Sequence, residues 1–370
     1  MIGMDRRIFI RTSMALAGLA LAPAARAAGD PVAALYRKAV VIDGNLVAPL
    51  DDEGPLDKAT ADAVRSSGLT ALKMTIGGSS GGFKEANEDI ASFDKAIAKS
   101  DGVYMKINTV SDLAVAKRTG RVGIIFSFES AAMLEDKVEH IDHFSSLGVR
   151  VMQLGYNVAS PFAYGVLTPQ PSPGLTALGR EAVARMNATG VTLDLSHADA
   201  RSTLDAIAVS KRPVLVTHAG CDAVYAHPRN KTDAVLRAVA DKGGVVGIYE
   251  LSFLSAGPAQ QSMADYLAHL EHALKICGED HVGIGSDAIL TTFDTTPASM
   301  EAWNKDIAAR KAAGIAAPGE GRPPFVEGLN RPDRAQVICR ALLKRGHKPR
   351  VVEKVLGANF QRVFAQTWPT

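Results

Sequence analysis

Short apolar runs alternate with longer amphipathic segments along most of the chain. Eight runs, rich in Val, Ile and Leu, have the length and composition of buried β-strands. They are Ala39–Asp43, Ala71–Thr75, Val122–Phe128, Val149–Leu154, Val191–Leu195, Val214–Thr217, Val245–Tyr249 and Val282–Gly285. Segments between most of them, such as Lys84–Ser100, Leu178–Thr189 and Met263–Cys277, carry apolar residues at helical spacing. This alternation predicts an α/β fold, the closed (β/α)8 or TIM barrel, with strands buried on both faces.

A doubly wound open sheet is the alternative fold. The glycine-rich phosphate-binding sequence that often accompanies that fold is absent after the first run. Polar side chains also collect directly after the runs, where a barrel would bring them to one mouth. They are Asn45, Glu129, Tyr156, Asn157, His197, His218 and Asp287. We therefore expect these residues to be neighbours.

Two of these runs end in the same way, with a His that follows at once. His197 follows the fifth run and His218 follows the sixth, with a helical pattern at Ala198–Ser210 between them. A strand–helix–strand unit makes its strands parallel, so both imidazoles reach the same end of the sheet. Glu129 ends another run, where an unpaired carboxylate would be costly to bury. Two imidazoles and a carboxylate match a catalytic zinc site, although the two His could instead close their strands independently.

The first residues have the features of an export signal. Residues 1–27 contain Arg6-Arg7, then an apolar stretch at Met14–Ala22, then Ala25-Arg26-Ala27 as a cleavage site. This order resembles a twin-arginine signal and predicts a periplasmic protein, with residues 28–370 as a single mature domain. Removing the leader's four Arg and one Asp changes the net charge from +2 to −1. The near-neutral mature chain gives no reason to expect nucleic acid as a partner, and no later run is long enough to anchor it in a membrane.

Four segments in combination resemble the membrane (renal-type) dipeptidases, metallopeptidase family M19. They are GLTALGREAVARMNATGVTLDLSHAD, VTHAGCDAVYAHPRN, HVGIGSD and VLGANFQRVF, and the resemblance extends from about Val40 to Phe364. It implies a TIM barrel of the metal-dependent hydrolase type, in which two zinc ions bridged by a Glu serve the cleavage of dipeptides by metal-activated water. Glu129 matches the bridging Glu, and His197 and His218 match the His pair of the second zinc.

The resemblance also implies roles for residues around the substrate. Arg229, within HPRN, matches the Arg that holds the substrate carboxylate. Asp287, within GSD, matches an acidic residue near the substrate amino group and the metal site, and it would also move a proton. Tyr156 falls where some members have a His that faces the scissile carbonyl. We therefore expect Asp287 and Tyr156 to be catalytic and to contact the substrate with Arg229.

Two residues after the first run depart from the family pattern. The family has D-G-H-N-D there, and its His and second Asp bind the first zinc; this chain has Asn45 and Val47 at those positions. Valine has no donor atom and an amide is a poor zinc ligand, so we expect an impaired first site and one zinc ion rather than two. A zinc-dependent dipeptidase is the main hypothesis. A hydrolase of another amide or lactone, and a non-catalytic relative that binds a small molecule, are the alternatives.

The region around residues 291–333 is a long insertion after the last run. It carries a helical patch at Met300–Ala313 and then a Gly/Pro-rich segment. A lid over the mouth and a homodimer contact are both open as roles. His269 and His272 lie on a helix outside the expected barrel, so we interpret them as packed residues rather than ligands.

Overall fold

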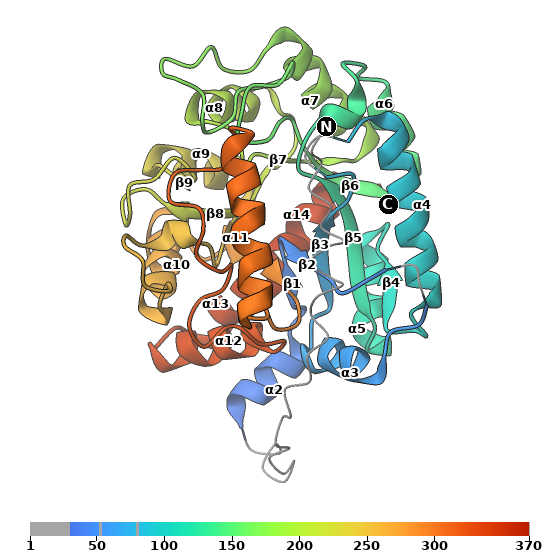
Figure 1. Cartoon of the computed structure of the whole chain (residues 1–370), viewed down its shortest axis with the longest axis vertical. Coiled ribbons are helices and arrows are strands. Elements are labelled where there is room, and N and C mark those ends of the chain that lie inside the picture. Colours follow the sequence, from blue (N-terminus) through green and yellow to red (C-terminus); the bar gives the residue numbers. More distant parts are fainter. Residues whose placement is uncertain (1–29, 52–53, 79–80, 370) are drawn as a thin grey trace.

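The computed structural model describes residues 30–51, 54–78 and 81–369, so the expected leader lies outside the described residues. Within them, eight parallel strands close into a ring in the order β1-β3-β5-β6-β7-β8-β10-β11, and β11 pairs again with β1 (Figure 1). They are β1 (Ile42–Asp43), β3 (Ala71–Thr75), β5 (Val122–Phe128), β6 (Val149–Gln153), β7 (Thr192–Asp194), β8 (Leu215–Cys221), β10 (Val245–Ile248) and β11 (Val282–Ile284). The predicted TIM barrel is confirmed. Each strand falls in one predicted run, although β8 continues beyond its run to Cys221.

Helices surround the strands, and most of them cover the outside of the ring, whereas α11 (Pro297–Ala312) lies across its mouth (Figure 1). They are α2 (Pro31–Lys38), α3 (Lys58–Ser66), α4 (Phe83–Lys99), α5 (Val110–Thr119), α6 (His140–Ser146), α7 (Ala177–Thr189), α8 (Ala200–Val209), α9 (Asp233–Asp241), α10 (Met263–Cys277), α11 (Pro297–Ala312), α12 (Arg334–Lys344) and α13 (Pro349–Glu353). The bounds of α10 are those predicted, because Ser262 and Asp265 form a capping box at its start and Gly278 ends it. None of the described helices combines the length and apolar character needed to cross a membrane.

Four short strands were not predicted. β4 (Tyr104–Lys106) pairs with the first half of β5, and β6 pairs with its second half. β2 (Leu46–Val47) pairs with β12 (Ala288–Ile289), and β9 (Asn230–Lys231) pairs with the end of β8. Segments of two or three residues carry too little periodicity to be recognised in a sequence. The β2–β12 pair ties the loops after β1 and β11 together at the mouth of the barrel.

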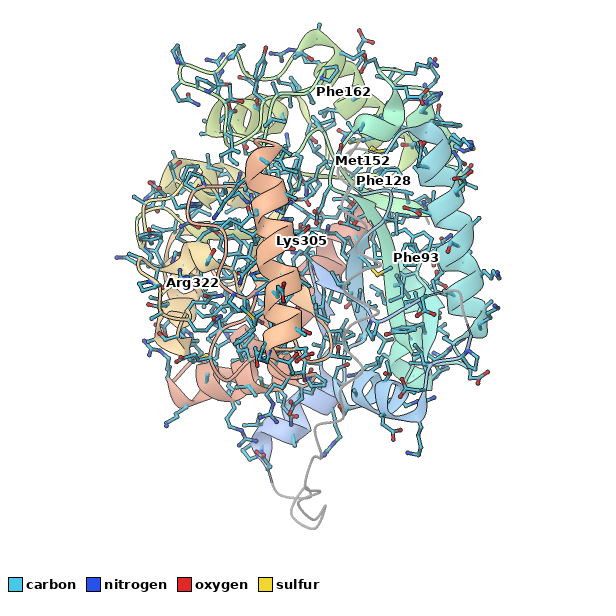
Figure 2. All side chains as sticks on the ribbon, viewed as in Figure 1. Phe93, Phe128, Met152, Phe162, Lys305 and Arg322 are labelled. Carbon is cyan, nitrogen blue, oxygen red and sulfur yellow. The ribbon has the colours of Figure 1, made fainter. Side chains whose placement is uncertain are left out.

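Alternate residues of β5 face opposite sides of the barrel wall. Phe126 packs on Phe93 of α4, with ring centroids 6.4 Å apart, and Phe128 packs on Phe144 of α6 at 4.9 Å. Phe93 and Phe128 are labelled in Figure 2. Ile125 belongs instead to the cluster that fills the barrel interior. Side chains along a strand alternate between its two faces. Ser127 and Glu129 are two and four residues after Ile125, so they are directed to the same side, toward the barrel axis.

The C-terminal helix closes the amino-terminal end of the barrel. α14 (Asn359–Thr367) follows a π-helical turn, η3 (Lys354–Ala358), and inserts Phe360 into the interior cluster. A Cβ added at Gly44 would lie 2.6 Å from the Phe360 ring, and one at Gly283 would lie 2.4 Å from it. Glycine is needed at both positions because the ring fills the space that a side chain would take. With this end packed solid, chemistry is confined to the opposite end.

Candidate active site

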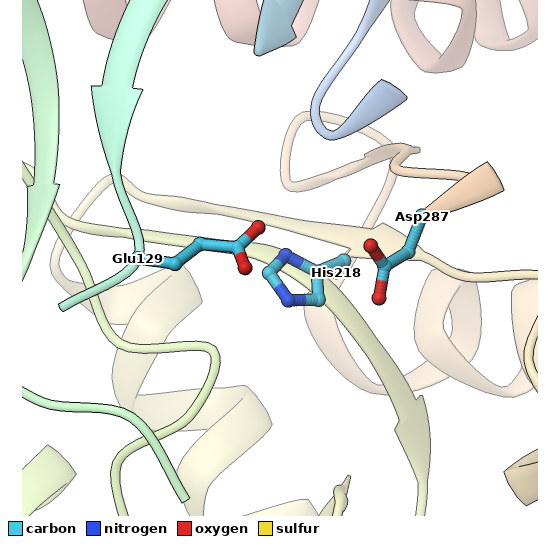
Figure 3. A group of neighbouring side chains, drawn as sticks. All are labelled: Glu129, His218 and Asp287. Atoms are coloured by element: carbon cyan, nitrogen blue, oxygen red, sulfur yellow. The ribbon is translucent and has the colours of Figure 1, made fainter. Parts of the chain in front are cut away.

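Three side chains that could hold a metal ion meet at the carboxyl end of the strands (Figure 3). Glu129 directly follows β5, His218 lies within β8, and Asp287 follows β11. One ligand atom from each lies within 4.8 Å of the others. Glu129 and His218 are buried, and Asp287 is half-buried. Residues that the sequence placed after separate strands therefore come together, as a barrel requires.

His197 lies beside this cluster. Its Nε2 atom is 3.0 Å from Nε2 of His218, and the two rings meet edge to face with centroids 5.0 Å apart. Burial lowers the pKa of His197 well below its ordinary value, and the positive charge of Arg229 lowers it further. The imidazole is therefore neutral near pH 7, which is the form that binds metals.

Hydrogen bonds decide which nitrogen of His218 carries its proton. The hydroxyl of Thr217 donates to Oδ2 of Asp194 at 2.6 Å. Because that proton is committed, Oγ1 of Thr217 acts as the acceptor for Nδ1 of His218, 2.9 Å away. Nδ1 thus bears the hydrogen and Nε2 presents its lone pair to the cluster.

The same argument holds for His197. Its Nδ1 atom lies 2.7 Å from Oδ1 of Asn157. The orientation of this amide is fixed because its Nδ2 donates to the carbonyl of Ile315 at 2.8 Å. Nδ1 of His197 therefore donates, and its Nε2 also presents a lone pair.

Two Nε2 lone pairs that face each other at 3.0 Å cannot form a hydrogen bond with each other unless a proton is added. Nη2 of Arg229 already donates to Nε2 of His197 at 3.4 Å, and a cation between the two rings would engage both lone pairs. Two imidazole nitrogens bound to one tetrahedral zinc lie about 3.3 Å apart, close to the distance found here. The three side chains whose ligand atoms all lie within 4.8 Å of one another are Glu129, His218 and Asp287, and His197 approaches this group through His218, so zinc binding by Glu129, His197 and His218 stays a prediction.

The positions of the family's first metal ligands offer no comparable donors. Val47 lies in β2, and its apolar side chain lines a pocket at the mouth of the barrel. Nδ2 of Asn45 donates to Oε1 of Glu129 and to Oδ1 of Asp287, both at 2.8 Å. Asn45 thus directs N–H groups, rather than its oxygen, toward both carboxylates. At these two positions, therefore, the structure presents an apolar side chain and amide N–H groups.

The backbone at Asp287 has an unusual conformation that places its side chain. Its φ is 51°, a left-handed conformation that few non-glycine residues adopt and that Asp tolerates better than most. The Asp287 N–H donates to the backbone carbonyl of Asn45 at 2.6 Å, which ties the end of β11 to the loop after β1. Such conformations persist where surrounding contacts hold them, and they are common at functional sites.

A pocket lies at the mouth of the barrel beside the cluster. Its wall includes residues from loops after the strands and from α11, among them Tyr156, His197, Arg229, Asp287, Trp303 and Arg310. The insertion thus contributes directly to the pocket, and α11 (orange) crosses in front of the barrel in Figure 1. The sequence indicated that the insertion could be a lid, but it did not identify Trp303 and Arg310 as residues of the pocket wall.

Arg229 is a fully buried cation in the wall of this pocket, with 1% of its surface exposed. Its Nη1 donates to the carbonyl of Ser196 at 2.6 Å, and its Nη2 lies 3.4 Å from Nε2 of His197. The backbone N–H of Arg229 donates to Nδ1 of His227 at 3.1 Å. The planar guanidinium is therefore held in one orientation beside the two His rings.

Tyr156 connects the His pair to the insertion. Its ring stacks on His197, with centroids 4.1 Å apart and planes at 24°. Nη2 of Arg310 donates to the phenol oxygen at 3.3 Å, and Arg310 is itself paired with Glu320. Burial raises the pKa of Tyr156, although the positive charge of Arg310 acts in the opposite direction. The phenol is therefore protonated near pH 7 and can donate a hydrogen bond.

The histidines of α10 lie outside the barrel, as expected. Nδ1 of His269 accepts from the backbone N–H of Cys221 at 2.8 Å, so its Nε2 donates to the carbonyl of Leu254 at 2.9 Å. His272 pairs with Asp233 at 2.7 Å. Both rings have structural partners, and neither belongs to the metal cluster described above.

Comparison with known proteins identifies relatives over most of the chain. Residues 56–306 match the membrane dipeptidase family, peptidase family M19. A protein of the pqqA 5′ region of Klebsiella pneumoniae is 28% identical over 290 residues, which cover 76% of this chain and 95% of that protein. A Schizosaccharomyces pombe protein named as an uncharacterized dipeptidase is 28% identical over 261 residues, which cover 69% of this chain but only 55% of the yeast protein.

A solved structure agrees with these sequence matches. The crystal structure of an amidohydrolase from Pseudomonas aeruginosa is 30% identical in sequence and superposes with a TM-score of 0.76. It covers 91% of this chain and 99% of its own. The family match and this structural agreement over nearly the whole chain show that the protein belongs to the membrane dipeptidase family, peptidase family M19, of metal-dependent hydrolases.

Proposed function

We propose that this protein hydrolyses the peptide bond of dipeptides with one zinc ion held by Glu129, His197 and His218. The 3.0 Å approach of the Nε2 atoms of His197 and His218, beside a pocket lined by Arg229, is the observation that carries the proposal. A zinc ion bound there would polarise the scissile carbonyl and lower the pKa of a water molecule. Family membership supports the same reaction, as does the name of the yeast relative.

The pocket wall carries one group for each charged end of a dipeptide. Arg229 offers a planar pair of N–H donors, a geometry that suits bidentate binding of the substrate carboxylate. Asp287 offers a negative charge for the substrate amino group, and because its carboxylate belongs to the cluster with Glu129 and His218, it could also accept or return a proton there. Tyr156 would donate its phenol hydrogen to the carbonyl oxygen, where negative charge develops as the bond is broken.

The insertion would enclose the substrate. Nε1 of Trp303 donates to the carbonyl of Gly321 at 2.7 Å, and its ring packs edge to face on Phe293 at 5.5 Å. These contacts fix Trp303 in the pocket wall, so α11 would exclude water from one side of the reacting groups. We assign residues 291–333 this lid role within the single mature domain.

The metal content follows from the residues after β1. Val47 has no donor, and Asn45 directs N–H groups at the carboxylates that a second ion would need. We therefore propose an impaired first site and one tightly held zinc per chain. For the leader, we propose export to the periplasm by a twin-arginine-like signal at residues 1–27.

Hydrolysis of a dipeptide panel by purified protein supplied with zinc or manganese tests the proposal. We expect cleavage of dipeptides with a free carboxyl end and poor cleavage of the same dipeptides after amidation. Arg229→Lys should raise KM with a smaller change in kcat, because it keeps the charge but loses the planar fork.

The matched control is Arg118→Lys, the same change at an exposed position on α5, which should alter neither constant. The dipeptidase proposal fails if no dipeptide is cleaved with either metal in excess. Equal cleavage of the free and the amidated dipeptides would contradict the role proposed for Arg229 and would favour a hydrolase that acts on amides more broadly.

A further inference from the structure

Lys73 is a buried cation beside the proposed zinc ligands. It lies in β3 two residues after Ala71, which belongs to the interior cluster, so both side chains face the inside of the barrel. The Lys73 side chain is 1% exposed. Its Nζ donates to Oγ of Ser127 at 3.2 Å and lies 3.9 Å from Oε1 of Glu129. Lysine is rarely buried in a barrel interior without a charged partner. Glu129 is that partner here.

The amide of Asn45 contacts the same carboxylate oxygen. Oε1 of Glu129 accepts from Nδ2 of Asn45 at 2.8 Å, and the second N–H of that amide is directed to Asp287. The opposite orientation would place the amide oxygen 2.8 Å from two carboxylate oxygens, where all three atoms could only accept hydrogen bonds. The orientation of Asn45 is therefore determined by its surroundings.

We infer that Lys73 and Asn45 together take the place of a second metal ion beside Glu129. A divalent cation between Glu129 and Asp287 would neutralise and orient both carboxylates. Here a lysine ammonium supplies positive charge to Glu129, and the amide N–H groups bridge Glu129 to Asp287. The inference rests on the proposed function in one respect, since it concerns the site assigned there to zinc.

The arrangement has a consequence for metal binding. A buried positive charge close to Oε1 of Glu129 repels a second cation placed against the same oxygen, and the low dielectric of the interior strengthens this repulsion. Replacing Asn45 and Val47 by the family's ligands should therefore not be enough to restore a second ion. Lys73 must also be removed.

Zinc per chain, measured by elemental analysis after dialysis against dilute zinc, tests this directly. We expect one zinc in the unaltered protein and one in the double variant Asn45→His/Val47→Asp. Adding Lys73→Met to that double variant should give two. Adding Lys106→Met instead should leave one, because Lys106 lies in β4, which pairs with β5, and its ammonium is paired with Asp94 rather than with the cluster.

Two equally tight zinc ions in the unaltered protein, or in the double variant that keeps Lys73, would overturn the inference. One zinc in a folded triple variant would also overturn it. If circular dichroism shows that the triple variant does not fold, the single variant Lys73→Met decides by chelator competition. Loss of the nearby positive charge should tighten zinc binding by about tenfold, and unchanged or weaker binding would contradict the inference.

These measurements need no substrate, so they are separate from the test of function. A protein that follows the expected zinc counts but cleaves no dipeptide would refute the proposed activity and leave the role of Lys73 in place. A dipeptidase whose double variant holds two zinc ions would do the reverse.

Discussion

Glu250 should make the stability of this protein depend on pH. Its side chain is fully buried after β10, where Nη1 of Arg334 and the backbone N–H of Val326 both lie 3.4 Å from Oε2. Oε1 has no hydrogen-bond partner among the residues that the structure describes. Burial raises the pKa of Glu250 from 4.5 to about 7, and the contact with Arg334 offsets only part of that effect.

The difference between the pKa of Glu250 in the unfolded and folded states sets the size and sign of its effect on the free energy of unfolding. Because the folded state holds the Glu250 proton more tightly than the unfolded state, the contribution of Glu250 to the free energy of unfolding is greatest below its unfolded pKa. It then decreases as pH rises from 4.5 to about 7, and it is constant above that. A pKa difference of this size corresponds to a loss of about 3 kcal/mol. Glu250→Gln removes the titrating group, so the variant should not show this loss.

Urea unfolding of the unaltered protein and of Glu250→Gln, repeated between about pH 5 and pH 8, measures the difference. We expect the variant to gain stability relative to the unaltered protein as pH rises. Glu181→Gln makes the same chemical change at an exposed position on α7, and its curve should stay parallel to that of the unaltered protein. Parallel curves for Glu250→Gln as well would refute the reasoning.

Three further predictions concern other parts of the chain. Phe360→Ala should lower the free energy of unfolding by about 3–5 kcal/mol, because a fully buried ring is lost from the closed end of the barrel; a loss below about 1 kcal/mol in urea unfolding would contradict that packing role. Arg310→Met should lower kcat on a cleaved dipeptide by about tenfold, because Tyr156 loses the contact that orients its phenol. Lys305→Met, an exposed change on the same helix (Figure 2), should leave kcat unchanged, and an equal loss in both variants would argue against a specific role for Arg310. Exported protein should begin after Ala27, and N-terminal sequencing that finds Met1 intact would exclude cleavage.

The sequence determined the fold because the signal for this fold is local. Each barrel strand is a short apolar run, and each run is followed by a helix with its own apolar spacing, so the alternation can be read without knowing any contact. The parallel arrangement then places His197 and His218 at one end, because strand, helix and strand connect in only one practical way. β4 escaped prediction because three residues give no usable period.

The tertiary structure decided which groups touch, because closure of the ring joins residues that are distant in the chain. The proton positions on the two imidazoles depend on Asn157 and Thr217, whose own partners are Ile315 and Asp194. No spacing in the sequence encodes these distances.

Lys73 illustrates the same limit. In the run ALKMT it reads only as a charge that interrupts an apolar strand. Its side chain points inward because alternate residues of β3 face the inside of the closed barrel. Its contact with Glu129 follows from the pairing of β3 with β5. Electrostatic interactions fall with distance and depend on burial, so the charge of a site is settled only when the barrel brings its walls together.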